Sequence, residues 1–233
     1  MRWQRVVPNP ADAADPPRRA HREMAAWSAS QLRTFLDHVR DDRWHPVWLL
    51  ASTTGARRGE LLGARWGDLD LDAGRWTVSQ ARTIAGHRES VGAPKTTAGA
   101  RTVALDPTTA ATLRGWRRRK LAERLAIGPA WPDVDLAFLE ADGTAPKPET
   151  ISRRFARLVT DTELPRIRLH DLRHTYATIA LCSGVPPHVV SRRLGHANIM
   201  VTLGLYAHLL PGADEQAAAT VAGAILGNSV TNP

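Results

Sequence analysis

The sequence predicts an α+β fold that is mainly α-helical and carries a small antiparallel β-sheet. Two patterns lead to this fold class. Apolar residues at helical spacing line one face of the segments 29–40 and 148–161. Residues 68–105 instead hold short segments of strand composition, two of them separated by the turn signal Asp72-Ala73-Gly74. Strands joined by so short a turn pair antiparallel, which gives the sheet.

The element boundaries follow from local start and stop signals. Ser28 and Gln31 form a capping box that begins the first helix. Asp106-Pro107-Thr108 begins a later one, Gly184 fits the position just after a helix end, and Pro186-Pro187 fits a new start. Helices are accordingly predicted at 29–40, 46–53, 57–64, 106–126, 148–161 and 213–226, and strands at 68–71, 75–81, 101–105 and 136–139.

The composition is typical of a globular protein that can form its own hydrophobic core. The chain has 233 residues, 43% of them hydrophobic and 23% charged, which is enough for one or two domains. No apolar run approaches the roughly 20 residues that span a bilayer, and the N-terminus lacks the apolar core of a signal peptide. The single cysteine, Cys182, excludes an internal disulfide and indicates the cytosol. Its apolar neighbours predict a buried thiol.

The chain is strongly basic, with a formal net charge of +8 and an isoelectric point near 10.8. Such a balance favours a polyanionic partner, nucleic acid above all. The charge run Arg117-Arg118-Arg119-Lys120 is nevertheless predicted to be a solvated helix face, because that is the usual role of such runs.

The segment 168–210 holds a set of side chains suited to attack on a phosphodiester. His170 and Arg173 are three residues apart, so on a helix they share one face. His196 follows in Leu-Gly-His, and Tyr206 comes ten residues later. A guanidinium pairs with phosphate, imidazoles transfer protons near neutral pH, and an activated phenol is a nucleophile.

These residues, in this order, resemble the catalytic signature of the tyrosine recombinases, the phage-type integrases. The C-terminal part is His-x-x-Arg-His, then Leu-Gly-His, then the tyrosine. The upstream motifs of the family are present as well, at 54–60 (Thr-Gly-Ala-Arg-Arg-Gly-Glu) and 94–96 (Pro-Lys-Thr). The resemblance implies the tyrosine recombinase catalytic fold and a site-specific recombinase of a mobile element.

The resemblance also implies a division of the chain into three parts. Residues 27–212 are expected to form the catalytic domain. Residues 1–26, rich in Pro, Ala, Asp and Arg, are expected to be a linker or arm, the remnant of a connection to a missing core-binding domain. Residues 213–233 are expected to be a C-terminal helix and tail that protomers exchange.

Three matched residues would carry out the ester exchange and the proton transfers. By resemblance, Tyr206 attacks the scissile phosphate and forms a 3′-phosphotyrosyl link, which the 5′-hydroxyl of a second strand then attacks. A phenol with a pKa of about 10 is protonated at neutral pH, so it needs a base, and the resemblance assigns that role to His170. Lys95 would deliver a proton to the leaving 5′-oxygen. Neither a metal ion, ATP nor any other cofactor is implied.

The remaining matched residues would bind the phosphate. The resemblance implies that Arg57 and Arg173 hold the non-bridging oxygens and that His196 hydrogen-bonds the same group. Glu60, three residues after Arg57, would support the side chains of Arg57 and His170. The implied partner is double-stranded DNA carrying recombination sites, bound by a homotetramer that is a monomer in solution. The implied location is the cytoplasm, at the nucleoid.

Two other functions stay open on the sequence alone. Without the core-binding domain, the chain could be a truncated, recombination-incompetent DNA-binding fragment. A zinc-dependent hydrolase is the more remote alternative, because His170 and His174 are four apart, as in a His-Glu-x-x-His helix. Asp171 in place of the glutamate, and the cation Arg173 beside the proposed metal, count against it. A type IB topoisomerase shares the recombinase chemistry, but the spacing from Leu-Gly-His to Tyr206 fits the integrases better.

Overall fold

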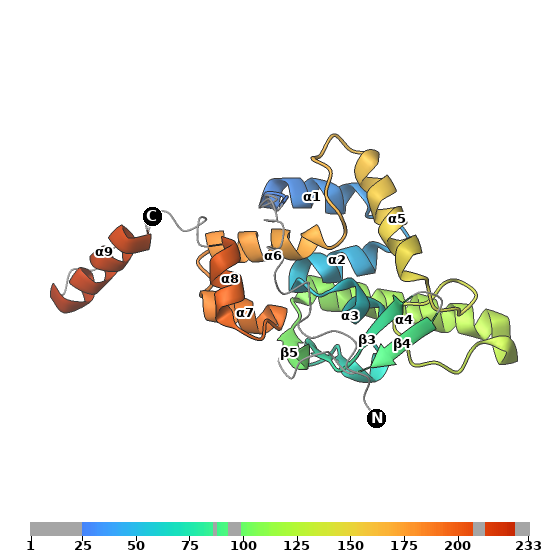
Figure 1. Ribbon diagram of the computed structural model, residues 1–233. Helices are drawn as coiled ribbons and strands as arrows, with labels where there is room; N and C mark the ends of the chain where they lie inside the picture. The colour runs from blue at the N-terminus through green and yellow to red at the C-terminus, as the bar shows by residue number, and fades with distance from the viewer. Residues whose placement is uncertain (1–24, 86–87, 93–98, 207–212, 227–233) are drawn as a thin grey trace, which may run out of the picture.

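Helix α2 (His45–Thr54) is buried along its length, and other helices pack around it (Figure 1). The computed structural model describes residues 25–85, 88–92, 99–206 and 213–226. A helix without a polar face has to be covered on all sides. Around α2 this cover comes from α1 (Ala29–His38), α4 (Pro107–Ile127) and α6 (Asp171–Cys182).

Four aromatic rings join α1, α2 and α5 (Pro148–Thr160). The ring of Phe155 lies with its centroid 5.2 Å from Phe35, 5.6 Å from Trp48 and 6.2 Å from Trp27. Trp27 also donates an indole hydrogen bond to the carbonyl of Pro165 at 2.8 Å, which ties the chain ahead of α6 to the same core. The predicted first helix and its Ser28–Gln31 capping box are confirmed, and so is the predicted helix at 148–161.

The predicted antiparallel sheet is present. It has the strand order β1 (Leu69–Asp70), β2 (Arg75–Val78), β5 (Arg101–Ala104), with Trp76 opposite Val103. The mainly helical α+β class is therefore confirmed.

A second sheet was not predicted, the hairpin of β3 (Ala81–Ala85) and β4 (Arg88–Gly92). The strand expected at 75–81 ends at Val78 because the next two residues are held elsewhere. Ser79 donates to Asp68 at 2.6 Å, and Gln80 donates to the carbonyl of Gly63 at 2.8 Å.

The hairpin lies directly on helix α3 (Arg58–Leu62), and two glycines allow this close approach. A Cβ on Gly59 would come within 2.9 Å of the carbonyl oxygen of Arg82, and a Cβ on Gly63 within 3.0 Å of its nitrogen. The short helix and the hairpin therefore pack as one layer, which positions the start of α3.

Two sequence expectations fail together along α4. The strand expected at 136–139 is only an isolated bridge between Leu136 and Arg65, because the neighbouring carbonyls accept from side chains of α4. Trp116 donates to the carbonyl of Ala137 at 2.7 Å, and Lys120 to that of Leu139 at 3.0 Å. Lys120 is therefore buried, whereas the three arginines before it are exposed as predicted.

The helices that follow form a second, smaller apolar cluster. Helix α7 (Pro187–Leu194) starts at the predicted Pro-Pro pair and packs Val190 and Leu194 against α6. The predicted buried thiol of Cys182 is wrong. Cys182 is exposed at the end of α6, and its neighbours Ala180 and Leu181 face the cluster instead.

Helix α8 (Ile199–Tyr206) packs on α7, and the predicted last helix is present as α9 (Ala213–Leu226). In Figure 1, α9 lies outside the body that the other elements form. Its apolar residues Val221, Ile225 and Leu226 are 56%, 75% and 71% exposed. No helix within the described ranges has the length and apolar character to cross a membrane.

The aromatic cluster gives a prediction about stability. Phe155 is fully buried among three other aromatic rings, so Phe155→Ala should lower the free energy of unfolding by about 3–5 kcal/mol. Chemical denaturation measures this value. The matched control is Leu125→Ala on α4, where the side chain is 84% exposed and the expected change is within about 0.5 kcal/mol. Equal effects of the two substitutions would contradict the assigned core.

Candidate active site

The C-terminal end of α7 gathers three arginines from distant parts of the sequence. The last carbonyls of a helix lack intrahelical partners and carry partial negative charge. Three consecutive carbonyls here each accept a hydrogen bond from one guanidinium. The carbonyl of Arg193 accepts from Arg101 at 2.5 Å, and the carbonyl of Leu194 accepts from Arg173 at 2.7 Å. The carbonyl of Gly195 accepts from Arg57 at 3.3 Å. The helix end therefore sets the relative positions of three cations.

Arg173 is enclosed by the protein, with 4% of it exposed. Besides the α7 carbonyl, it donates to the carbonyl of Gly55 at 2.9 Å, at the C-terminal end of α2. Gly55 has a φ of 65°, and a Cβ there would meet Leu194 at 2.5 Å and the ring of Tyr176 at 2.7 Å. Only glycine fits this position, where the ends of α2 and α7 meet around one guanidinium.

Glu60 is the buried anion of the site, with 2% of it exposed. It accepts from the backbone N–H and from Nη1 of Arg57, both at 2.8 Å. Its other partner is Arg101, whose two terminal nitrogens reach the two carboxylate oxygens at 3.1 and 2.9 Å. Glu60 thus forms an ion pair with Arg57. In the described part of the chain, no hydrogen bond joins Glu60 to His170, because Arg101 occupies the second side of the carboxylate.

Opposing effects act on the Glu60 carboxyl. Burial alone raises its pKa, but the hydrogen bonds and charge of Arg101, followed by those of Arg57, outweigh burial and leave the pKa below the ordinary value. Glu60 is therefore a carboxylate at neutral pH, and it stays charged because two guanidinium groups compensate it.

His170 immediately precedes α6, and its ring faces that of His174 edge-on at 5.5 Å between centroids. Burial, followed by the charges of His174 and Arg173, lowers the pKa of His170. The imidazole is therefore neutral at pH 7, which is the state that can accept a proton. The described residues hold no group of three or more His, Cys, Asp or Glu side chains placed to bind a metal, so the zinc alternative has no third ligand there.

His196 follows directly after the carbonyls that bind the arginines. Its Nδ1 lies 2.8 Å from the hydroxyl of Thr202, a fully buried residue of α8. Burial, followed by the charges of Arg173 and Arg57, lowers the pKa of His196 to about 4. The hydrogen bond also fixes the first turn of α8 to the end of α7, so the helix that ends at Tyr206 is attached to the arginine cluster.

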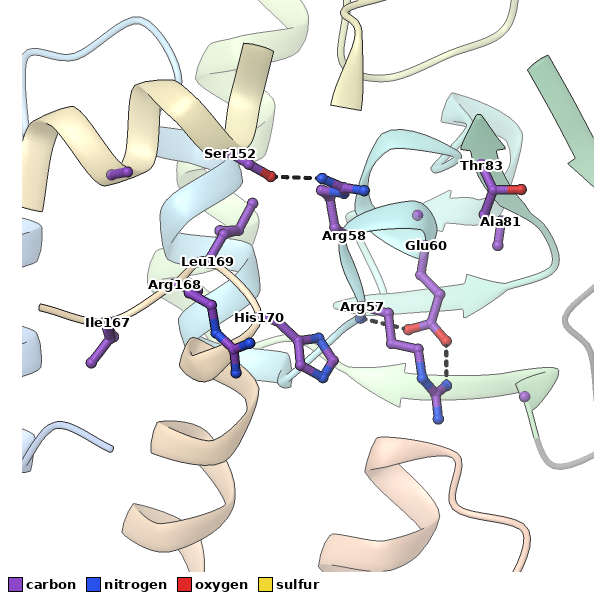
Figure 2. A pocket seen from close by; sticks show the side chains of 13 residues that line it. Arg57, Arg58, Glu60, Ala81, Thr83, Ser152, Ile167, Arg168, Leu169 and His170 are labelled. Atoms are coloured by element: carbon purple, nitrogen blue, oxygen red, sulfur yellow. Dashed lines mark hydrogen bonds and ion pairs between the residues drawn. The ribbon is translucent and has the colours of Figure 1, made fainter. Parts of the chain in front are cut away.

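A cavity of about 760 Å³ opens beside these groups, between α3, β3, α5 and the chain ahead of α6. Figure 2 shows Arg57 and His170 at its wall, with the Arg57–Glu60 pair drawn as dashed lines. The side chain of Arg57 is 40% exposed there. Its neighbour Arg58 is turned to α5, where it donates to Ser152 at 2.8 Å.

Five of the predicted site residues are thus brought into one region by the described structure: Arg57, Glu60, His170, Arg173 and His196. Tyr206 is the last residue of α8, and its side chain lies outside the described part. Lys95 also lies outside the described residues.

Arg101 is the residue that the sequence analysis missed. A usable signal existed, because side chains two apart in a strand point to the same face. Arg101 therefore shares the inward face of β5 with the buried Val103. A charge on that face of a strand needs a buried partner of opposite sign, and Glu60 is the partner.

The phage integrase family profile matches residues 27–212 of this chain. The chain belongs to the phage integrase family. The resemblance drawn from the sequence motifs is thereby confirmed, and the arginine cluster, His170, His196 and the helix ending in Tyr206 all lie within the matched region.

Individual family members show how far the similarity extends. This integrase-family chain is 27% identical over 208 residues to a protein named tyrosine recombinase XerC-like from Caldanaerobacter subterraneus subsp. tengcongensis, which covers 84% of this chain and 53% of that protein. It is 25% identical over 214 residues to the ICEBs1 integrase of Bacillus subtilis, covering 90% and 57%. The chain therefore spans about half the length of the curated relatives it matches.

Solved structures agree on the fold. The Tn1549 transposon integrase in complex with circular intermediate DNA superposes with a TM-score of 0.69 at 23% identity, covering 84% of this chain and 65% of that one. The catalytic domain of bacteriophage HP1 integrase gives a TM-score of 0.52 at 20% identity, covering 91% and 99%. At these identities the likeness establishes the fold, which is the tyrosine recombinase catalytic fold expected from the motifs.

His196 gives a prediction about pH. Its pKa of about 4 in the folded protein, against 6.5 ordinarily, means that the folded state binds fewer protons than the unfolded state between those values. Stability contributed by this residue is therefore lost as the pH falls from 6.5 towards 4. An NMR titration of the imidazole nitrogens should show the low pKa in the folded protein and the ordinary one in urea. A folded-state midpoint near the ordinary value would contradict the enclosed, cationic surroundings.

Proposed function

We propose that this chain carries the catalytic machinery of a site-specific DNA recombinase. It would cut and rejoin double-stranded DNA through a 3′-phosphotyrosyl intermediate, without metal or ATP. The observation that carries the proposal is that adjacent carbonyls at the end of α7 hold Arg57 and Arg173 directly before His196. Cations fixed in advance stabilise the charge that develops on a phosphate during transfer. Family membership supports the same reaction class.

The proposed cleavage step exchanges one phosphate ester for another. Tyr206 Oη forms a bond to the scissile phosphorus while the bond from phosphorus to the 5′-oxygen breaks. The phenolic proton passes to His170, and the 5′-oxygen receives a proton from Lys95. Attack by the 5′-hydroxyl of a second strand reverses these changes, so the bond energy is conserved. The roles of Tyr206 and Lys95 rest on the family resemblance.

The phosphate site of the proposal consists of Arg57, Arg173 and His196. The side chain of Arg57 is exposed at the cavity, so it can contact a non-bridging oxygen. Arg173 is enclosed and adds positive charge at the same helix end. His196 Nδ1 lies 2.8 Å from the hydroxyl of Thr202. The proposal requires this hydroxyl to donate to Nδ1, so that Nε2 carries the hydrogen that is donated to the phosphate.

The alternative is a DNA-binding fragment that is incompetent in recombination. Such a fragment would need positive charge for phosphate contacts but no neutral histidines beside it. The lowered pKa values of His170 and His196 and their placement beside the arginines favour catalysis over binding alone.

The proposal predicts a covalent protein–DNA complex. With a nicked suicide duplex that carries a recombination site, the wild type should form a complex that survives denaturation, and Tyr206→Phe should abolish it. Arg57→Ala and Arg173→Ala should each slow its formation by about 10²–10³-fold, because each removes preorganised charge from the transition state. Gel electrophoresis under denaturing conditions with labelled DNA measures the rate.

Tyr176→Phe is the matched control, because Tyr176 is the other tyrosine of the chain and is packed against the second apolar cluster. It should still trap DNA. Trapping by Tyr206→Phe would show that the nucleophile is misassigned, and inhibition of the wild type by EDTA would count against a metal-free reaction. DNA binding by the wild type without any covalent product would support the fragment alternative.

We also propose that the protein acts in the cytoplasm at the nucleoid, as a monomer in solution and a cyclic homotetramer on DNA. In this assembly α9 would dock on a neighbouring copy. The support is the exposed apolar side of α9, at Val221, Ile225 and Leu226, on a helix that lies outside the body of the domain (Figure 1). Exposed apolar side chains gathered on one element are typical of a protein contact.

Removal of residues 213–233 tests this assembly. The shortened chain should bind a single DNA site nearly as well as the full chain but form far less of the higher-order complex, because the contact between copies is lost. Mobility-shift titration and light scattering on DNA measure the two properties. A chain with Val221→Ser and Ile225→Ser, which keeps its full length, is the matched control and should show the same defect. Equal loss of single-site binding would mean that α9 belongs to the domain's own core.

A further inference from the structure

Arg101 reaches the site from β5 without facing the cavity. Its side chain is 6% exposed, and every guanidinium nitrogen is bonded within the protein. Nε donates to the carbonyl of Arg193, the two terminal nitrogens donate to Glu60, and one of them also donates to the carbonyl of Gly99 at 3.0 Å. A guanidinium whose nitrogens are all hydrogen-bonded within the protein cannot itself bind a DNA phosphate. Any effect of Arg101 on the reaction is therefore exerted through its partners.

The partners of Arg101 include or lie close in sequence to both hydrogen-bond acceptors of the Arg57 side chain. One acceptor is Glu60, which Arg101 binds directly. The other is the carbonyl of Gly195, two residues after the Arg193 carbonyl that Arg101 binds. Arg101 thus connects α3 with the end of α7, the two elements between which Arg57 is held.

The charge balance of the group depends on Arg101 as well. Glu60 carries one negative charge, and its ion pair with Arg57 alone would be neutral. Arg101 adds a second positive charge on the same carboxylate and leaves the three residues with a net charge of +1. A buried carboxylate shared by two cations can orient Arg57 while Arg57 keeps its attraction for an anion.

We propose that Arg101 is a positioning residue for Arg57: it compensates Glu60, so that this carboxylate orients the Arg57 guanidinium without cancelling its charge towards the scissile phosphate. The proposal rests on the recombinase function proposed above. It assigns Arg101 no contact with DNA and no proton transfer.

The first test is single-turnover cleavage of the suicide duplex by Arg101→Met, a substitution that removes the charge and keeps an unbranched side chain. Cleavage should slow by about 10²-fold, the usual effect of losing one preorganised charge at a transition state. The dissociation constant for the duplex should change much less. Arg75→Met on β2 is the matched control, because Arg75 is exposed in the same sheet and pairs through its backbone with Ala104. It should cleave like the wild type.

The second test separates charge balance from packing. In Arg101→Met the carboxylate of Glu60 is left to cancel Arg57, so adding Glu60→Gln should restore the net charge and recover at least about tenfold of the lost rate, each tenfold being about 1.4 kcal/mol. In the wild-type background Glu60→Gln should slow cleavage. A double variant no faster than Arg101→Met would overturn the proposal. Arg101→Lys keeps the charge, so its cleavage rate should lie within about tenfold of the wild-type rate. If Arg101→Met does not fold, the Lys variant decides: cleavage as slow as that of Arg57→Ala would overturn the proposal.

A measurement without DNA keeps this proposal separate from the recombinase function. The pKa of the Glu60 carboxyl, followed by carbon NMR, should rise in Arg101→Met and stay unchanged in Arg75→Met, because Arg101 hydrogen-bonds the carboxylate and lowers its pKa. If the wild type forms no covalent complex, the proposed function fails. If the wild type cleaves and Arg101→Met cleaves equally fast, the recombinase function stands and the positioning role fails.

Discussion

The hydrogen bonds between the end of α7 and three arginines are the interaction on which the rest of the site depends. The carbonyls of a buried helix end need donors, and buried guanidinium groups need acceptors, so each set would be costly without the other. Here the two needs are met together by residues 193–195. Gly195, with a φ of 67°, then turns the chain so that the N–H of His196 bonds back to the Ser191 carbonyl. The histidine is thereby fixed next to the cations.

Burial, together with this concentration of positive charge, determines the protonation of the neighbouring groups. Burial and the nearby cations lower the pKa values of His170, His174 and His196, so all three imidazoles are neutral at physiological pH. Glu60 is the exception, a charged group kept charged by two guanidinium partners. The charges are therefore in place before any substrate arrives, which is the condition under which electrostatic stabilisation of a transition state is strongest.

The surrounding helices and the hairpin fix the positions of the arginines in the cluster. The fully covered helix α2 ends at Gly55, whose carbonyl binds Arg173. The glycines of α3 bring the hairpin of β3 and β4 against the helix that starts next to Arg57. The arginines are consequently held mainly by regular elements, and small changes in α2, α3 or α7 would be transmitted to the proposed phosphate site.

The sequence by itself determined the fold class, the helix starts at Ser28 and Pro186-Pro187, and the choice of most candidate site residues. These features are local, because capping and motif spacing depend on residues that are close along the chain. Only the tertiary structure decided which side chains meet. Arg101 lies 41 residues from Glu60, and nothing local pairs them. In the same way, Lys120 is buried and residues 136–139 form no strand because α4 packs against that segment. Burial and hydrogen-bond partners are provided by elements that are distant in sequence. Burial and partners in turn determine the charge balance and the pKa values of the site, so these properties cannot be read from a sequence motif.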